Sequence, residues 1–186
     1  MTIFSTDVCI PFPCALVYAT YRDKLAELAP YMPDVKLIVI KSRREEGTKI
    51  HFVSDWHVGG DIPFATRAIL SDEMLSWTEY TTWNESELTM EWRLETHAFT
   101  EAVQCRGKNY FKADGNTTII ESRGELNIDS TKIKGVPHFL ATKIADVVRD
   151  FLGKQIEPNL IQMSGGVHLY LEQEAKSAQI EQESIS

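Results

Sequence analysis

Polar and apolar residues alternate along much of the stretch 35–129, and this period of two predicts a succession of β-strands. The alternation is clearest at 88–95, where every second residue is apolar and the residues between are polar or charged. Polar turns at 45–47, 84–86 and 113–116 divide the stretch into three pairs of strands. A sheet with one apolar and one polar face is typical of antiparallel strands that are covered on one side only.

A different pattern covers residues 138–171, where apolar residues recur every three or four positions. This spacing predicts a long amphipathic helix, whose apolar face would cover the sheet. Pro158 lies inside the pattern and predicts a kink, and Gly165 and Gly166 are a point where the helix could break.

The remaining segments complete one domain over residues 1–171. Residues 3–10 are predicted to form a first strand, and residues 13–33 form two short helices that end at Pro30 and Pro33. Residues 61–74 fit either an eighth strand or a loop, and the loop could gate an entrance. Residues 172–186 are mostly Glu, Gln, Ser and Ala, and they could extend the last helix but are predicted to be a disordered tail.

Composition narrows the function. The net charge is −8, so the general electrostatic footprint of a nucleic-acid-binding protein is absent. The three cysteines are widely spread, which predicts free thiols rather than a disulfide framework or a zinc site. The N-terminus does not resemble a signal peptide and no run of apolar residues is long enough to cross a membrane, so the expected location is cytoplasmic. We predict no metal and no cofactor, and the oligomeric state stays open.

The order of elements predicts an internal space. Gly107 and Gly124 lie inside predicted strands and indicate bends, as a strongly curved sheet requires. A long helix across the concave side of such a sheet, with short helices at one end, is expected to leave a pocket lined mainly by apolar groups. The four tryptophans all fall on predicted strands, where they are either walls of that pocket or simply core.

This order of elements resembles the helix-grip fold of the START and birch-pollen-allergen superfamily, also called SRPBCC or polyketide cyclase/lipid-transport-like proteins. The chain is also similar in places to the PRELI family of phospholipid carriers. The matching positions are Pro11-Phe12, the alternation of Val35, Ile38 and Ile40 around Lys36, Arg43-Arg44, a strand ending near Trp56, Thr89-Met90, and Asn159. The carriers place basic side chains near the helix Asn, whereas this chain has Gln162 and Ser164.

The resemblance implies an α+β fold in which a curved seven-stranded antiparallel sheet wraps a long C-terminal helix, with two short helices after the first strand. It also implies binding or transport of a hydrophobic small molecule, such as a lipid, isoprenoid or polyketide, with transient membrane contact possible. The ligand-binding residues expected on this basis are Phe52, Trp56, Trp77, Tyr80, Met90, Trp92, Val148, Phe151 and Asn159. Asn159 and Tyr80 are the polar groups expected to orient the ligand.

Two other functions stay open. A cyclase- or hydrolase-type enzyme on the same scaffold would need a titratable residue in the pocket, for which His51, His57 and Glu79 are candidates. A protein-interaction module would instead expose an apolar groove. Arg22, Lys24, Arg43 and Arg44 are either contacts for a ligand's polar end at the pocket mouth or ordinary surface charges.

Overall fold

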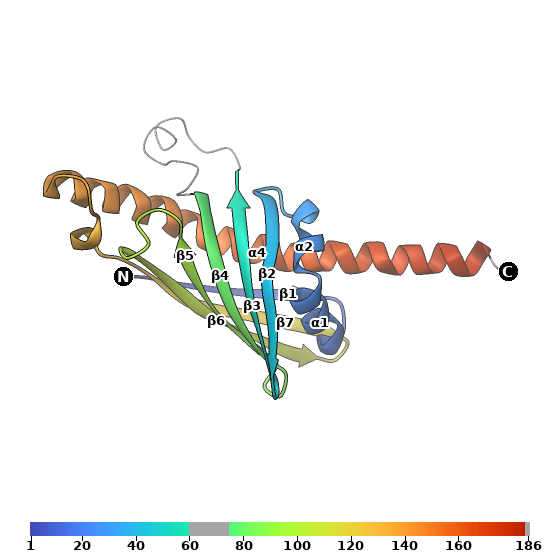
Figure 1. The fold of residues 1–186 in the computed structure, drawn as a ribbon. Coiled ribbons are helices and arrows are strands. Elements are labelled where there is room, and N and C mark those ends of the chain that lie inside the picture. Colours follow the sequence, from blue (N-terminus) through green and yellow to red (C-terminus); the bar gives the residue numbers. More distant parts are fainter. Residues whose placement is uncertain (60–74, 185–186) are drawn as a thin grey trace.

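The computed structural model describes residues 1–59 and 75–184. Within them the elements follow the predicted order of strand, short helices, six strands and long helix (Figure 1). The strands are β1 (Thr2–Ile10), β2 (Val35–Glu46), β3 (Lys49–Val58), β4 (Ser76–Asn84), β5 (Thr89–Thr96), β6 (Val103–Asp114) and β7 (Thr117–Ile128). The helices are α1 (Cys14–Asp23), α2 (Leu25–Leu28), the 3-10 turns η1 (Ala29–Tyr31) and η3 (Ser130–Lys132), and α4 (His138–Ser184).

The seven strands form one sheet in the order β1-β7-β6-β5-β4-β3-β2, and every neighbouring pair is antiparallel. The strands from β2 to β7 therefore run back and forth between sequence neighbours, and β1 lies at the far edge beside β7. Gly47 and Gly115 have positive φ angles in two of the hairpin turns, where a residue without a Cβ is least strained. The predicted seven-stranded antiparallel sheet is confirmed.

Two glycines allow the sheet to bend around its contents. Gly107 of β6 and Gly124 of β7 are direct partners in the register, and each lies under an aromatic ring. A Cβ on Gly107 would stand 2.4 Å from the indole of Trp92, and a Cβ on Gly124 would stand 2.4 Å from the ring of Phe4. The rings of Phe4 and Trp92 stack with their centroids 5.8 Å apart. The glycines thus give these two aromatic residues room on the concave face.

Helix α1 closes one end of the sheet. Tyr18 and Tyr21 follow the helical period, so both point from α1 into the concave face, where they pack against Trp83 and Phe111. The ring centroids of these pairs lie 5.1–5.6 Å apart, and those of Trp83 and Phe111 lie 5.7 Å apart. This aromatic cluster fills the α1 end of the core.

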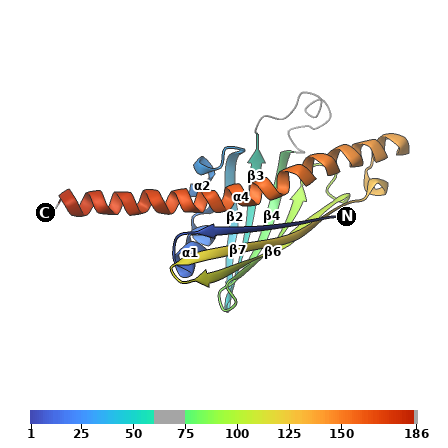
Figure 2. The ribbon, with the colours of Figure 1, turned by 180° about the vertical axis from the view of Figure 1, so that it is seen from behind.

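Helix α4 lies across the concave face of the sheet, as both views show (Figures 1 and 2). It is continuous through Pro158 and through Gly165-Gly166, so the expected break is wrong. A Cβ on Gly166 would lie 3.4 Å from the side chain of Met32, which is an ordinary contact distance, so α4 packs closely against the segment after α2 at this point.

The helix also extends farther than the sequence pattern indicated. The apolar period ends near Leu171, but α4 continues to Ser184, and residues 173–184 are exposed. Glu, Gln, Ala and Lys are good helix formers, which explains why the helix can continue without an apolar face. The alternative interpretations of residues 61–74, including the gate, concern residues that lie outside those described.

Candidate functional site

A cavity of about 100 Å³ remains between the concave face of the sheet and α4. Its walls come from α1, from the strands β2 to β6 and from α4. The lining residues are Tyr21, Met32, Val35, Trp56, Val58, Trp77, Glu79, Met90, Trp92, Leu94, Thr96, Val103, Cys105, Leu152, Ile156, Asn159, Leu160, Gln162 and Met163. The space is smaller than the pockets of roughly 300–1,000 Å³ that hold drug-sized ligands.

The alternation of side chains along strands and the spacing of side chains along a helix explain which residues reach the cavity. On β4 the alternate residues Trp77 and Glu79 point inward, and on β3 Trp56 does so. On α4 the lining positions Leu152, Ile156 and the residues near 160 are three or four residues apart, so they share one helix face. Each of these elements therefore contributes one of its faces to the cavity wall.

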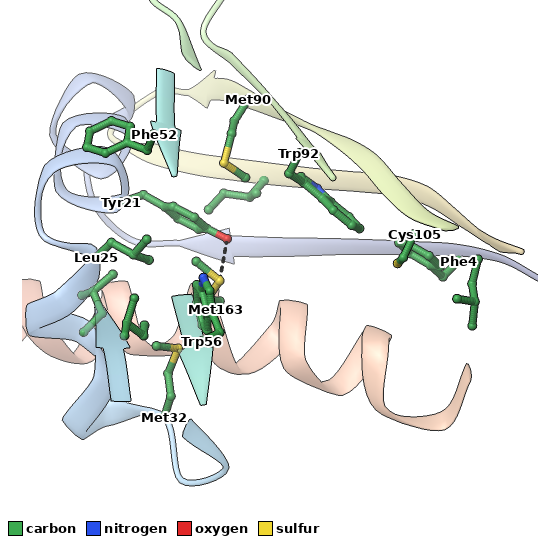
Figure 3. Close-up of a cluster of buried hydrophobic side chains, with 14 of the residues drawn as sticks. Phe4, Tyr21, Leu25, Met32, Phe52, Trp56, Met90, Trp92, Cys105 and Met163 are labelled. Carbon is green, nitrogen blue, oxygen red and sulfur yellow. Dashed lines mark hydrogen bonds between the residues drawn. The ribbon is translucent and has the colours of Figure 1, made fainter. Parts of the chain in front are cut away.

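Tyr21 separates the cavity from the aromatic cluster at the α1 end. Figure 3 shows its ring reaching between Met90 and Trp92 of the sheet and Met163 of α4. Its hydroxyl donates a hydrogen bond to the sulfur of Met163 at 3.3 Å. This contact joins α1 to α4 across the core and fixes the inner end of the cavity.

Glu79 is the one carboxyl group among the described residues that line the cavity. It is 9% exposed, and the Nε1–H of Trp56 donates a hydrogen bond to its Oε2 at 3.1 Å. Burial raises the pKa of Glu79 to about 7, because the charged form loses its hydration, and the bond from Trp56 opposes that rise only in part. Near neutral pH this carboxyl group is therefore present in both protonation states.

Other polar atoms of the lining lack partners within residues 1–59 and 75–184. They are the Nε1–H of Trp77, the hydroxyl of Thr96 and the Oε1 of Gln162. Trp77 and Thr96 are direct partners in the register of β4 and β5, so their unpaired groups approach the cavity from neighbouring strands. The Nε2 of Gln162 donates to the Oδ2 of Asp34 at 2.9 Å, which holds the amide in place. A buried polar group without a partner is costly, so these atoms are candidates to bind a ligand.

Five of the nine predicted ligand-binding residues line this cavity, namely Trp56, Trp77, Met90, Trp92 and Asn159. Phe52 is buried on the same face of β3 but lies closer to α1, beside the cavity rather than in its wall (Figure 3). Val148 and Phe151 lie nearer the start of α4, where they line a separate hollow of about 20 Å³ with Phe99. Whether any of these residues contacts a ligand stays a prediction.

Tyr80 lies on the opposite face of the sheet, and its place in the cavity was wrongly predicted. Its ring packs under the guanidinium group of Arg93, 3.7 Å from the ring centroid, in a shallow depression of the outer surface. The alternation of the strand already requires this, because Trp77 and Glu79 cannot both point inward unless Tyr80 points outward.

Of the three titratable candidates, only Glu79 faces the cavity. His51 and His57 point to the outer face of β3, where their Nδ1 atoms pair with Thr82 and Ser76 at 3.0 and 3.1 Å. The part of the chain that is described contains no group of three His, Cys, Asp or Glu side chains that could hold a metal ion.

The basic candidates also lie away from the cavity. Arg22 pairs with Asp23 at 2.7 Å and with Glu85 at 2.6 Å, and Arg43 pairs with Glu45. None of these side chains is in the cavity wall. They are thus paired surface charges.

Sequence reasoning missed Tyr21, Thr96, Val103, Cys105 and most of the α4 positions among the cavity walls. A signal for Glu79 was present, because it shares its face of β4 with Trp77 and Trp83, and an acid between two tryptophans indicates a buried carboxyl group. Tyr21 lies on an apolar stripe of its short helix, which indicates burial, but no local pattern places it beside a cavity.

Several solved structures have a similar fold. A protein of Thermus thermophilus matches with a TM-score of 0.62 and 17% identity, over 89% of this chain and 94% of that one. The Zhui aromatase/cyclase of Streptomyces sp. R1128 matches with a TM-score of 0.59 and 15% identity, over 95% and 96%. A START superfamily protein of Mycobacterium smegmatis matches with a TM-score of 0.52 and 13% identity, over 93% and 99%.

The chain is similar to known proteins in its three-dimensional structure, and the comparisons of its sequence find no match. No protein-family model matches the chain, and the search of curated proteins finds no relative. Identities of 13–17% establish a shared fold and nothing finer. None of the helices in the described ranges has the length and apolar character needed to span a membrane.

Proposed function

Because the chain has the helix-grip fold of the START superfamily, we propose that it binds a hydrophobic small molecule in the cavity between the sheet and α4. The observation that carries this proposal is the cavity itself. Protein interiors are normally packed without voids larger than a water molecule, so an unfilled apolar space among these residues has a cost that a bound ligand would offset.

The composition of the walls allows the cavity to accept molecules larger than its present volume. Met32, Met90 and Met163 all line it, and methionine side chains have three rotatable bonds and adapt to irregular shapes. Burial of a ligand would contribute about 25 cal/mol per Å² of apolar surface, from which the cost of association is subtracted. A ligand of modest size is therefore favoured over a two-chain lipid.

An enzyme of the cyclase type is the second candidate, and Glu79 is the observation that favours it. A carboxyl group with a pKa near 7 in an apolar cavity can both accept and donate a proton at neutral pH. One of the structures with this fold is an aromatase/cyclase, although the low identity carries no activity over to this chain. An added ligand that is recovered with altered mass after incubation would favour this candidate.

Native mass spectrometry tests the binding proposal. The purified protein, as isolated and after incubation with apolar small molecules, should carry a bound molecule of defined mass. Leu160→Trp would fill the cavity from α4 and should abolish the bound species. Leu169→Trp places the same ring on an exposed position of the same helix and should leave binding unchanged.

Two results would refute the proposal. The first is a wild-type protein that binds none of the molecules offered. The second is equal binding by the wild type and Leu160→Trp, which would place the ligand outside the cavity.

A further inference from the structure

The charge of the cavity wall is unusual for a site that would bind lipids with acidic ends. Among the described residues that line it there is one acidic side chain, Glu79, and there is no Lys, Arg or His. A carboxylate or phosphate placed there would face Glu79 in a medium of low dielectric constant and would find no cation to offset the repulsion.

Resting on the proposed function, we propose that Glu79 selects ligands by their polar end, so that the cavity takes an apolar alcohol or phenol and rejects carboxylates and phosphates. Among the ligand classes that the fold allows, this favours hydroxylated isoprenoids and phenolic molecules over fatty acids and phospholipids.

The wall offers hydrogen-bonding groups to a hydroxyl. Glu79 has accepting capacity beyond its bond from Trp56, and Trp77, two residues away on the same face, has an unpaired donor. A hydroxyl group both donates and accepts, so it can use the acceptor of Glu79. An ammonium group would be attracted by the ionised Glu79 but would lose its hydration in the apolar cavity.

Among the described residues of the cavity wall, Glu79 is the group whose charge changes with pH near neutrality. Tyr21 from α1 and Cys105 from β6 face it, and burial raises the pKa of each. Both groups are therefore uncharged between about pH 6 and 8. Over this range the charge of Glu79 grows, because its pKa is about 7. Rejection of anions should consequently increase with pH.

Three naphthalene derivatives with matched rings test the selection. We would measure the binding of 2-naphthol, 2-naphthoate and 2-(aminomethyl)naphthalene at pH 8 by calorimetry, with naphthalene as the probe for the apolar cavity alone. We expect 2-naphthol to bind at least about tenfold more tightly than 2-naphthoate, which corresponds to about 1.4 kcal/mol. The amine, which the ionised Glu79 attracts, should also bind more tightly than 2-naphthoate.

Glu79→Gln tests whether this residue is the cause. The variant keeps the shape and the acceptor for Trp56 but has no charge, so the ratio between 2-naphthol and 2-naphthoate should fall to about threefold or less. In the wild type the affinity for 2-naphthoate should fall between pH 6 and 8, and in the variant it should be constant. Glu91→Gln, on the exposed face of β5, should behave as the wild type does.

The possible results distinguish a failure of the selection by Glu79 from a failure of the proposed binding function. If naphthalene binds but the wild type does not prefer 2-naphthol, or if Glu79→Gln leaves the preference unchanged, the selection by Glu79 is refuted and the binding cavity stands. Tighter binding of 2-naphthoate than of the amine likewise refutes the repulsion of anions by Glu79. If none of the four probes binds, naphthalene included, the proposed function itself fails, and the selection fails with it.

Discussion

Replacing Glu79 by Gln should change how the stability of the protein depends on pH. Burial raises the pKa of Glu79 from 4.5 to about 7 in the folded state, whereas the unfolded chain keeps the ordinary value. Below pH 4.5 the carboxyl group is protonated in both states. As the pH rises through the interval, the unfolded chain releases its proton first, so the free energy of unfolding falls, and it levels off above pH 7. The size of the loss is about 3 kcal/mol, from about 1.36 kcal/mol per unit of pKa.

Gln has no charge at any pH and should remove this loss. The difference in unfolding free energy between Glu79→Gln and the wild type should therefore shift by about 3 kcal/mol in favour of the variant between pH 4 and pH 8. Urea denaturation followed by tryptophan fluorescence at pH 4, 5, 6, 7 and 8 measures it. Glu91→Gln, on the opposite face of the sheet, should show no comparable shift. A difference between Glu79→Gln and the wild type that is constant with pH would refute the burial argument.

Four further predictions concern the packing and the electrostatics of the fold. Gly107→Ala should lower the free energy of unfolding by about 2 kcal/mol, because a Cβ would stand 2.4 Å from an indole ring and 2.6 Å from a carbonyl oxygen. Gly153→Ala, where a Cβ meets no atom within 4 Å on α4, should raise it by about 1 kcal/mol, and chemical denaturation measures both. Trp56→Phe removes the hydrogen bond that lowers the pKa of Glu79, so the decline of stability should extend to higher pH in a titration of unfolding free energy. Deletion of residues 173–186 should change the free energy of unfolding by less than about 0.5 kcal/mol, since residues 173–184 are exposed, and a larger change would show that this part of α4 has a packing role.

Much of the fold was predictable because its elements have strong local periods. The alternation at Met90 and Trp92 and the helical period through Leu160 are each set by one face buried against another element. Turn residues such as Gly115 then divide the strands at the right places. Local patterns failed at Gly165 and Gly166, which usually weaken a helix but lie inside the continuous α4, because packing of a helix can outweigh local propensity.

The candidate site was only partly predictable, because a cavity is defined by side chains from distant segments. Trp56, Trp77, Met90 and Trp92 were expected in its wall, as large apolar residues on strands, and they lie there. Tyr80 was assigned to the wrong face of the sheet, although the alternation of side chains along its strand places it opposite Glu79. The partner that makes Glu79 a buried carboxyl group, Trp56, lies 23 residues away along the chain, and no local pattern links the two.

The amino-acid sequence by itself determined which elements form and which of their faces are apolar, because those properties depend on neighbours within a few residues. The tertiary structure decided where the faces leave a space between them and which polar atoms point into it without partners. The cavity is the space that the side chains of the bent sheet and of the helix do not fill. Its size depends on the sum of many side-chain volumes, so it is defined only when the whole chain is packed.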